Sequence, residues 1–193
     1  MAWRVVIALS CLVALPALPI DVGGVRLQEM VRLSAEHEPV KLNGAAVRRF
    51  AAHPVYVGGL YLTVPATDVE TVINAKGAKR IFLICKTSAI SSANLRQSFE
   101  QGLAINNPPE TLEKIHGQVQ AFLDIWRDHE LKKGDSVWID FIPGQGTRVY
   151  INQKLLKVIP GKAFYDAFLR AWLGKYPINP YMKKAMLQGL AKN

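Results

Sequence analysis

Polar and apolar residues alternate over much of the first third of the chain, which predicts β-strands. Three such stretches, rich in Val, Tyr and Leu and separated by turn residues, cover residues 25–33, 39–50 and 53–65. A short helix is expected from Asp68 to Ala75, capped by Thr67 or Asp68 and stopped by Gly77. The apolar run 80–88 then predicts a buried strand.

The middle of the chain changes to a helical period. A serine cap precedes residues 91–106, where Leu95, Phe99 and Leu103 recur every four positions. Residues 108–126 start with two prolines and are predicted as one further helix. Its apolar residues fall on one face: Leu112, Ile115, Val119, Phe122, Leu123 and Trp126. Both helices are therefore expected to cover an apolar surface.

The last third returns to strands and closes with two helices. Residues 135–143 predict a strand, and residues 147–159 predict a hairpin that ends at Pro160. The first closing helix carries Phe164, Phe168 and Trp172 and stops at Gly174; the second starts at Asn179-Pro180. Its apolar residues are predicted to be Tyr181, Ala185 and Leu190.

This order of elements predicts the fold class. Strands are clustered along the chain and helices are grouped rather than alternating with them, which favours an α+β domain with a mainly antiparallel sheet and helices on one face. No internal repeat or low-complexity linker divides the 193 residues, so one domain is expected.

Gly144-Gln145-Gly146 raises the question of a phosphate-binding loop. Such a loop needs its glycines between a strand and the start of a helix, so that backbone N–H groups face the anion. The next residues, 147–151, are β-branched or aromatic and predict a strand instead. We therefore interpret the glycines as a bend that leads into the hairpin.

Composition and motifs exclude several functions. The chain carries 24 Lys and Arg against 15 Asp and Glu, but the basic residues come as scattered pairs without an RNA-binding or zinc-finger motif, so no nucleic-acid partner is expected. The four histidines show no metal-ligand spacing, and there is no Gly-x-Ser-x-Gly elbow. We expect no metal site.

The N-terminus has the layout of a secretory signal peptide. A short positive start, Met1 to Arg4, precedes the apolar run Val5–Ala14, which is too short to span a bilayer. We predict a signal peptide over residues 1–19, a domain over residues 22–193, and secretion to a periplasm. The alternatives are an uncleaved anchor or a buried first strand. The mature chain would have no stable membrane span, and its one cysteine, Cys85, could form no internal disulfide.

Arg48 and Arg49 are the strongest candidates for ligand contacts. Neighbouring residues of a strand point to opposite faces, so one of these arginines should face inward or along the sheet. An inward arginine is costly unless it meets an anion or hydrogen-bond acceptors. It could therefore hold a ligand carboxylate, phenolate or enolate, or form an internal ion pair.

Residues 42–62, 143–161 and 168–180 together resemble the bacterial chalcone isomerase-like domain family. The resemblance runs from about Lys41 to Leu190. It implies an open-faced β-sandwich in which a layer of helices covers a large antiparallel sheet, with a cleft between the two layers and no metal or organic cofactor. Plant enzymes of this fold close a chalcone into a flavanone; relatives bind fatty acids, and others have no known activity.

The resemblance also implies site residues. Gly44 to Arg48 matches the enzymes' Gly-Ala-Gly-x-Arg block, which gives Arg48 the place of the arginine that enzymes and fatty-acid binders share. The other four polar positions of the enzymes fall on Tyr56, Asn94, Gln101 and Ala171, each a substitution, with Trp172 beside the last. These six residues form the predicted ligand site.

Loss of those polar groups weakens isomerase chemistry more than ligand binding, because ring closure needs several preorganised hydrogen bonds. The sequence thus favours a non-catalytic protein that binds a small hydrophobic or amphipathic anion, such as a fatty acid. The alternatives are a cofactor-free intramolecular lyase acting on a chalcone-like enone, with Arg48 and Tyr56 on the substrate, and a structural or partner-binding module. No protein partner is indicated.

Overall fold

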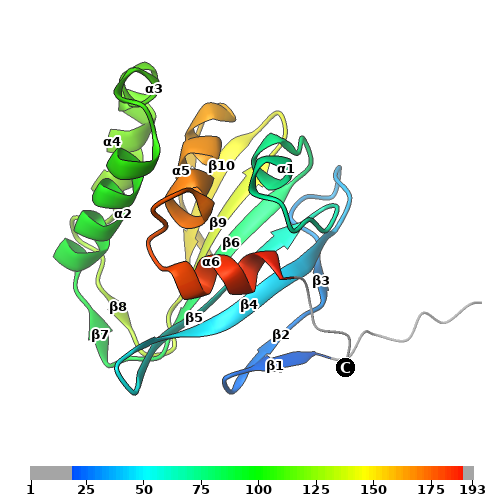
Figure 1. The fold of residues 1–193 in the computed structure, drawn as a ribbon, viewed down its shortest axis with the longest axis vertical. Coiled ribbons are helices and arrows are strands. Elements are labelled where there is room, and N and C mark those ends of the chain that lie inside the picture. The colour runs from blue at the N-terminus through cyan, green and yellow to red at the C-terminus, as the bar shows by residue number, and fades with distance from the viewer. Residues whose placement is uncertain (1–18, 189–193) are drawn as a thin grey trace, which may run out of the picture.

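A computed structural model describes residues 19–188, and its central feature is a seven-stranded sheet (Figure 1). The strand order is β11-β10-β9-β6-β5-β4-β3, and every neighbouring pair is antiparallel. The strands are β3 (Met30–Val31), β4 (Val40–Phe50), β5 (His53–Leu62), β6 (Lys79–Cys85), β9 (Ser136–Ile142), β10 (Gly146–Ile151) and β11 (Lys154–Ile159). Two small two-stranded sheets flank it, β1 (Ile20–Val22) with β2 (Val25–Leu27) and β7 (Ala89–Ile90) with β8 (Leu131–Lys132).

The helices supply one side of the main core, and the N-terminal hairpin covers part of the other face of the sheet (Figure 1). Helix α5 is central: its Phe164, Phe168 and Trp172 are buried between the sheet and α2. The helices are α1 (Val69–Asn74), α2 (Ser92–Asn106), α3 (Pro109–Lys114), α4 (His116–Ile125), α5 (Ala163–Leu173) and α6 (Pro180–Leu187). The predicted α+β class, an antiparallel sheet with a layer of helices, is confirmed.

Three elements differ from the sequence prediction. Residues 108–126 form two short helices, because the chain leaves the helical conformation at Ile115. Residues 25–33 form two short strands, β2 and β3, instead of one. Helix α6 buries Met182 and Met186, whereas Tyr181 is 62% exposed and Ala185 is partly buried. Leu190, predicted on the same face, lies outside the described residues, as does the predicted leader up to residue 18.

The two glycines of Gly144-Gln145-Gly146 shape a turn between two strands. Strand β9 ends at Ile142 and β10 begins at Gly146, which pairs with Ile142. Gly144 and Gly146 have φ angles of +75° and +87°, a region that glycine adopts without steric cost. Because a strand and not a helix follows, the interpretation as a bend is confirmed.

A β-bulge at Asn43 determines which face of the sheet each later residue of β4 occupies. Leu42 pairs with Tyr61 and Gly44 pairs with Leu60, which leaves Asn43 as an extra residue. Leu42 therefore packs with the N-terminal hairpin, while Ala46 belongs to the core under the helices. Arg48, two residues further, faces the helix side as well.

The Asn43 side chain joins three separate parts of the chain. It is 1% exposed, and its amide nitrogen donates to the carbonyl oxygens of Ala66 and Met186 at 2.8 and 2.7 Å. Its amide oxygen accepts from the Ala66 N–H at 2.8 Å. Next to it, α6 packs so closely on Gly44 that a Cβ there would overlap the carbonyl oxygen of Ala185. The bulge thus holds the end of α6 against β4.

We expect Asn43→Ala to destabilise the fold by about 2 to 4 kcal/mol, because it leaves buried backbone groups of Ala66 and Met186 without partners. Urea unfolding, followed by far-UV circular dichroism, measures this change. Asn74→Ala, at an exposed position near the end of α1, is the control and should cost far less. Equal losses in the two variants would show that the buried amide contributes little.

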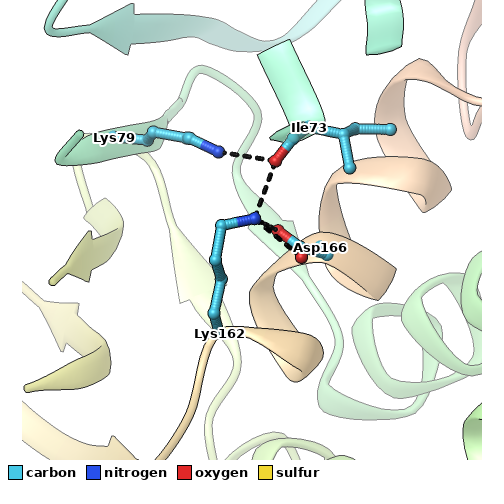
Figure 2. A network of polar contacts seen from close by, with 4 residues as sticks. All are labelled: Ile73, Lys79, Lys162 and Asp166. Carbon is cyan, nitrogen blue, oxygen red and sulfur yellow. Dashed lines mark hydrogen bonds and ion pairs between the residues drawn. The ribbon is translucent and has the colours of Figure 1, made fainter. Parts of the chain in front are cut away.

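Two lysines, one buried and one partly exposed, meet at the C-terminal end of α1 (Figure 2). Lys79 on β6 is 1% exposed, and its ammonium donates to the carbonyl oxygen of Ile73 at 2.9 Å. Lys162, just before α5, donates to the same carbonyl at 2.9 Å and to both carboxylate oxygens of Asp166 at 2.6 and 2.8 Å. The Asp166 carboxylate thus forms its ion pair with Lys162. The Lys79 ammonium donates to the Ile73 carbonyl oxygen and lies 5.9 Å from the centre of the Phe141 ring.

Burial, reinforced by the nearby charge of Lys162, lowers the pKa of Lys79 from its usual 10.5 to about 8, although Asp166 acts in the opposite direction. Between these two pH values the unfolded chain keeps a proton that the folded protein has lost. The free energy of unfolding therefore gains a contribution that rises with pH over this range.

We predict that the stability of the wild type relative to Lys79→Met rises by about 1 to 3 kcal/mol between pH 7.5 and 9.5, since each pKa unit is worth about 1.4 kcal/mol. Chemical unfolding at several pH values measures the difference. Lys154→Met, at an exposed position on β11, should track the wild type at every pH. A pH-independent difference for Lys79→Met would mean that the two states titrate alike.

Candidate functional site

A cavity of about 400 Å³ lies between the ends of β4, β5 and β6 and the helices α2 and α5. Its inner wall is apolar and includes Val55, Leu83, Leu95, Phe99 and Leu131. Cys85 also lines it, and burial raises the pKa of this thiol, against the opposing effect of its hydrogen bond with the Thr87 backbone. Because the Cys85 thiol stays neutral, this wall carries no charge and can accommodate an apolar group.

Helix α2 borders this cavity and an adjoining groove of about 600 Å³. Asn94 and Ser98 line the cavity, while Ser98, Gln101 and Ile105 line the groove. Their spacing of four, three and four residues places them along one side of the helix, next to the buried stripe that contains Leu95 and Phe99. The cavity and the groove share Arg48, Ser98 and Ile178, so Arg48 lies where they meet.

Arg48 is the one charged residue among those that line the cavity and the groove, and no carboxylate lines either of them. Within residues 19–188 it forms no ion pair, and its Nε is buried without a hydrogen-bond partner. Its guanidinium carbon is 5.6 Å from the centre of the Tyr56 ring, its cross-strand partner on β5. An unpaired guanidinium in such a place favours an anion.

Tyr56, next to Arg48, and Trp172, next to Tyr56, carry two further donors. Burial raises the pKa of Tyr56 to about 12, although the charge of Arg48 opposes this, so the hydroxyl keeps its proton at neutral pH. The rings of Tyr56 and Trp172 meet edge to face, 6.4 Å between centres. The Trp172 Nε1 is buried and has no partner among the described residues. Arg48, Tyr56 and Trp172 thus bring three hydrogen-bond donor groups to the lining of the cavity.

The structure brings together most of the residues predicted from the sequence. Arg48, Tyr56, Asn94 and Trp172 line the cavity, and Gln101 lines the groove beside it. Ala171 does not line either space: it is fully buried in α5 and its methyl group faces Gly102 of α2. Its neighbour Trp172 supplies the α5 side chain of the cavity instead.

Arg49 points away from this site. It borders a different depression with Asp21, Asn179 and Tyr181, and its Nη1 donates to the carbonyl oxygen of Ala52 at 3.0 Å. The two arginines are therefore separated as the alternation of strand residues predicts. A second irregularity in the β4–β5 pairing, between Arg48 and Arg49, lies at the same point.

Several lining residues were not predicted. Ser98 follows Asn94 by one helical turn, and this spacing could have identified it. Phe50 and Ile178 carried no such signal, since Phe50 lies just before a hairpin turn and Ile178 lies in the loop before α6. Cys85 was expected in the core and is buried, yet it also faces the cavity.

Within residues 19–188, no group of three or more His, Cys, Asp or Glu side chains is arranged to hold a metal ion. Over the same residues, no helix combines the length and the apolar character needed to cross a bilayer.

The arrangement offers hydrogen-bond donors at one end of an apolar cavity. Among the lining residues there is no histidine or carboxylate that could act as a general base near neutral pH. Such a site suits a molecule with an anionic head and an apolar tail.

Comparison with known proteins identifies the same architecture. The model of the chalcone isomerase-like family matches residues 19–188. The fold is similar to the crystal structure of a fatty-acid binding protein from Arabidopsis thaliana, with a TM-score of 0.62 and 14% sequence identity, over 85% of this chain and 92% of that one. At this identity the likeness concerns the fold alone. The search of curated proteins finds no match.

Proposed function

Because the chain belongs to the chalcone isomerase-like family, we propose that it is a non-catalytic protein that binds a small amphipathic anion, such as a fatty acid, between its sheet and its helices. The observation that carries this proposal is the unpaired guanidinium of Arg48 at the edge of an apolar cavity whose lining includes no carboxylate. The similar plant structure, described as a fatty-acid binding protein, supports the choice of ligand class.

Each end of such a ligand would gain free energy in a different way. A carboxylate at Arg48 would form charge-assisted hydrogen bonds, with the Tyr56 hydroxyl and the Trp172 indole N–H as neutral donors nearby. The tail would lie against Leu83, Phe99 and Leu131, where each buried methylene contributes about 0.8 kcal/mol. Asn94 and Gln101 would border the head group from α2.

We predict that Arg48→Ala lowers the affinity for a fatty acid by about 2 to 5 kcal/mol, the usual cost of removing one member of a buried charge pair. Calorimetric titration of delipidated protein with medium- and long-chain fatty acids measures it. Arg49→Ala, one residue away on the opposite side, is the matched control and should bind as the wild type does. A folded wild type that binds no fatty acid would refute the ligand class, and equal binding by Arg48→Ala would make this arginine structural.

The alternative, ring closure of a chalcone-like enone, is supported by one observation: Arg48 and the protonated hydroxyl of Tyr56 lie next to each other at the cavity. They could polarise a ketone. However, Asn94, Gln101 and Ala171 stand where the enzymes carry other polar groups, and Ala171 does not reach the cavity.

We therefore expect chalcone to cyclise at or near its uncatalysed rate in the presence of the protein, because the positioning hydrogen bonds are lacking. Absorbance and chiral chromatography of the flavanone measure rate and stereochemistry. Tyr56→Thr alone should not raise the rate. Fast, stereoselective cyclisation by the wild type would establish the enzyme instead.

We also propose that the protein is bacterial, because of the sequence resemblance to the bacterial chalcone isomerase-like proteins, and that it is exported to the periplasm, because of the charged start and apolar run of residues 1–14. Processing is expected between Ala14 and Val22. In the structure β1 begins at Ile20, so cleavage at or before Pro19 would keep this strand whole. N-terminal sequencing of protein expressed in a bacterial host tests the proposal, and recovery of Met1 would contradict it.

A further inference from the structure

Three large apolar side chains are exposed around the opening of the cavity and the groove. Phe50 borders the cavity and is 74% exposed; Ile105 and Tyr176 border the groove and are 59% and 52% exposed. We call these three residues the rim. Exposed apolar side chains that surround a binding site, rather than being scattered singly, indicate a surface that meets another apolar phase.

The rim residues are held in place by the fold. Phe50 pairs with His53 at the closed end of the β4–β5 hairpin, and Ile105 lies on the last turn of α2. Tyr176, in the loop between α5 and α6, is held by Asn106: its N–H donates to the Asn106 side-chain oxygen at 2.9 Å, and its carbonyl accepts from the amide nitrogen at 2.7 Å. The exposure of these side chains is therefore built into the fold.

Two lysines lie beside the Tyr176 part of the rim. The Lys175 ammonium lies 5.2 Å from the centre of the Tyr176 ring. The Lys183 ammonium donates to the carbonyl oxygen of Gly174 at 2.8 Å, which holds a second cation next to the same loop. Arg48 lies inside the opening, and the lining contains no carboxylate. Aromatic and aliphatic tips next to lysines fit the headgroup region of an anionic bilayer.

We propose that the rim docks on an anionic lipid bilayer, so that the cavity opens toward the membrane from which an amphipathic ligand can enter. This inference rests on the proposed function, because docking would serve to collect a ligand of a class that partitions into membranes. Lys175 and Lys183 would face the lipid phosphates, while Phe50, Ile105 and Tyr176 would insert among the headgroups. The net positive charge, +9 for the full 193-residue sequence, would add a favourable long-range attraction.

The test is sedimentation of ligand-free protein with vesicles of phosphatidylcholine alone and vesicles that also contain phosphatidylglycerol. The wild type should bind the anionic vesicles, and high salt should weaken that binding. The triple variant Phe50→Ser, Ile105→Ser, Tyr176→Ser should lower the partition coefficient at least about tenfold. Lys175→Glu should also weaken binding.

Val64→Ser is the matched control, because Val64 is 74% exposed but borders neither the cavity nor the groove. Circular dichroism confirms that each variant is folded. No binding of the wild type to anionic vesicles, or an equal loss in Val64→Ser and the triple variant, would overturn the inference.

A separate calorimetric titration of the wild type with fatty acid distinguishes the two proposals. Fatty-acid binding without vesicle binding would refute the docking surface alone. Vesicle binding without fatty-acid binding would refute the proposed ligand and keep the surface.

Discussion

The buried amide of Asn43 is the interaction on which the candidate site depends. As the extra residue of a β-bulge it shifts the alternation of β4 by one position, and its three hydrogen bonds hold that shift in place. Without the bulge, Arg48 would share the face of Val40 and Leu42, under the N-terminal hairpin. With it, Arg48 lies on the helix side, opposite α2. The same amide donates to the carbonyl oxygen of Met186 at the end of α6, so it also fixes α6 against β4.

The candidate site carries a positive charge that no negative charge among its lining residues balances. Arg48 brings a positive charge, Tyr56 and Trp172 bring neutral donors, and the lining residues bring no negative charge to compensate. Elsewhere in residues 19–188, Arg80 forms a bidentate ion pair with Asp140, with N–O distances of 2.6 and 2.7 Å. The buried Lys79 has no carboxylate partner and donates to a backbone carbonyl. The charge of Arg48 has neither kind of partner among the described residues, and a bound anion would balance it.

Much of the fold could be predicted from the sequence because its hydrophobic periods are long and its turn residues are clear. The strands 39–50 and 53–65 and the helix 91–106 were found this way. The break at Ile115 was missed because the apolar stripe continues through it from Leu112 to Val119. In α6, the sequence is compatible with an apolar face that begins at Tyr181 and with one that begins at Met182. The choice of Met182 depends on the close approach of α6 to the sheet over Gly44 and Gly58, which single-sequence patterns do not show.

The site was predicted less completely. The separation of Arg48 from Arg49 follows from the alternation of side chains along a strand. Which of the two faces the helices depends on the β-bulge at Asn43, and the pattern of polar and apolar residues does not predict that bulge. The cost of burying an unpaired guanidinium, together with the family resemblance, favoured Arg48. Ala171 and Gln101 were placed by alignment, and a residue on a helix moves to another face when the alignment shifts by one position. In the structure Trp172 lines the cavity, whereas its neighbour Ala171 faces α2.

The most direct test of this account is a crystal structure of the protein with a fatty acid that carries bromine at the end of its tail. We predict an anomalous bromine peak beside Leu83 and Leu131, and carboxylate oxygens about 2.7 to 2.9 Å from the Arg48 guanidinium. A fatty acid bound elsewhere, or one whose carboxylate lies away from Arg48, would contradict the assignment of this cavity as the ligand site.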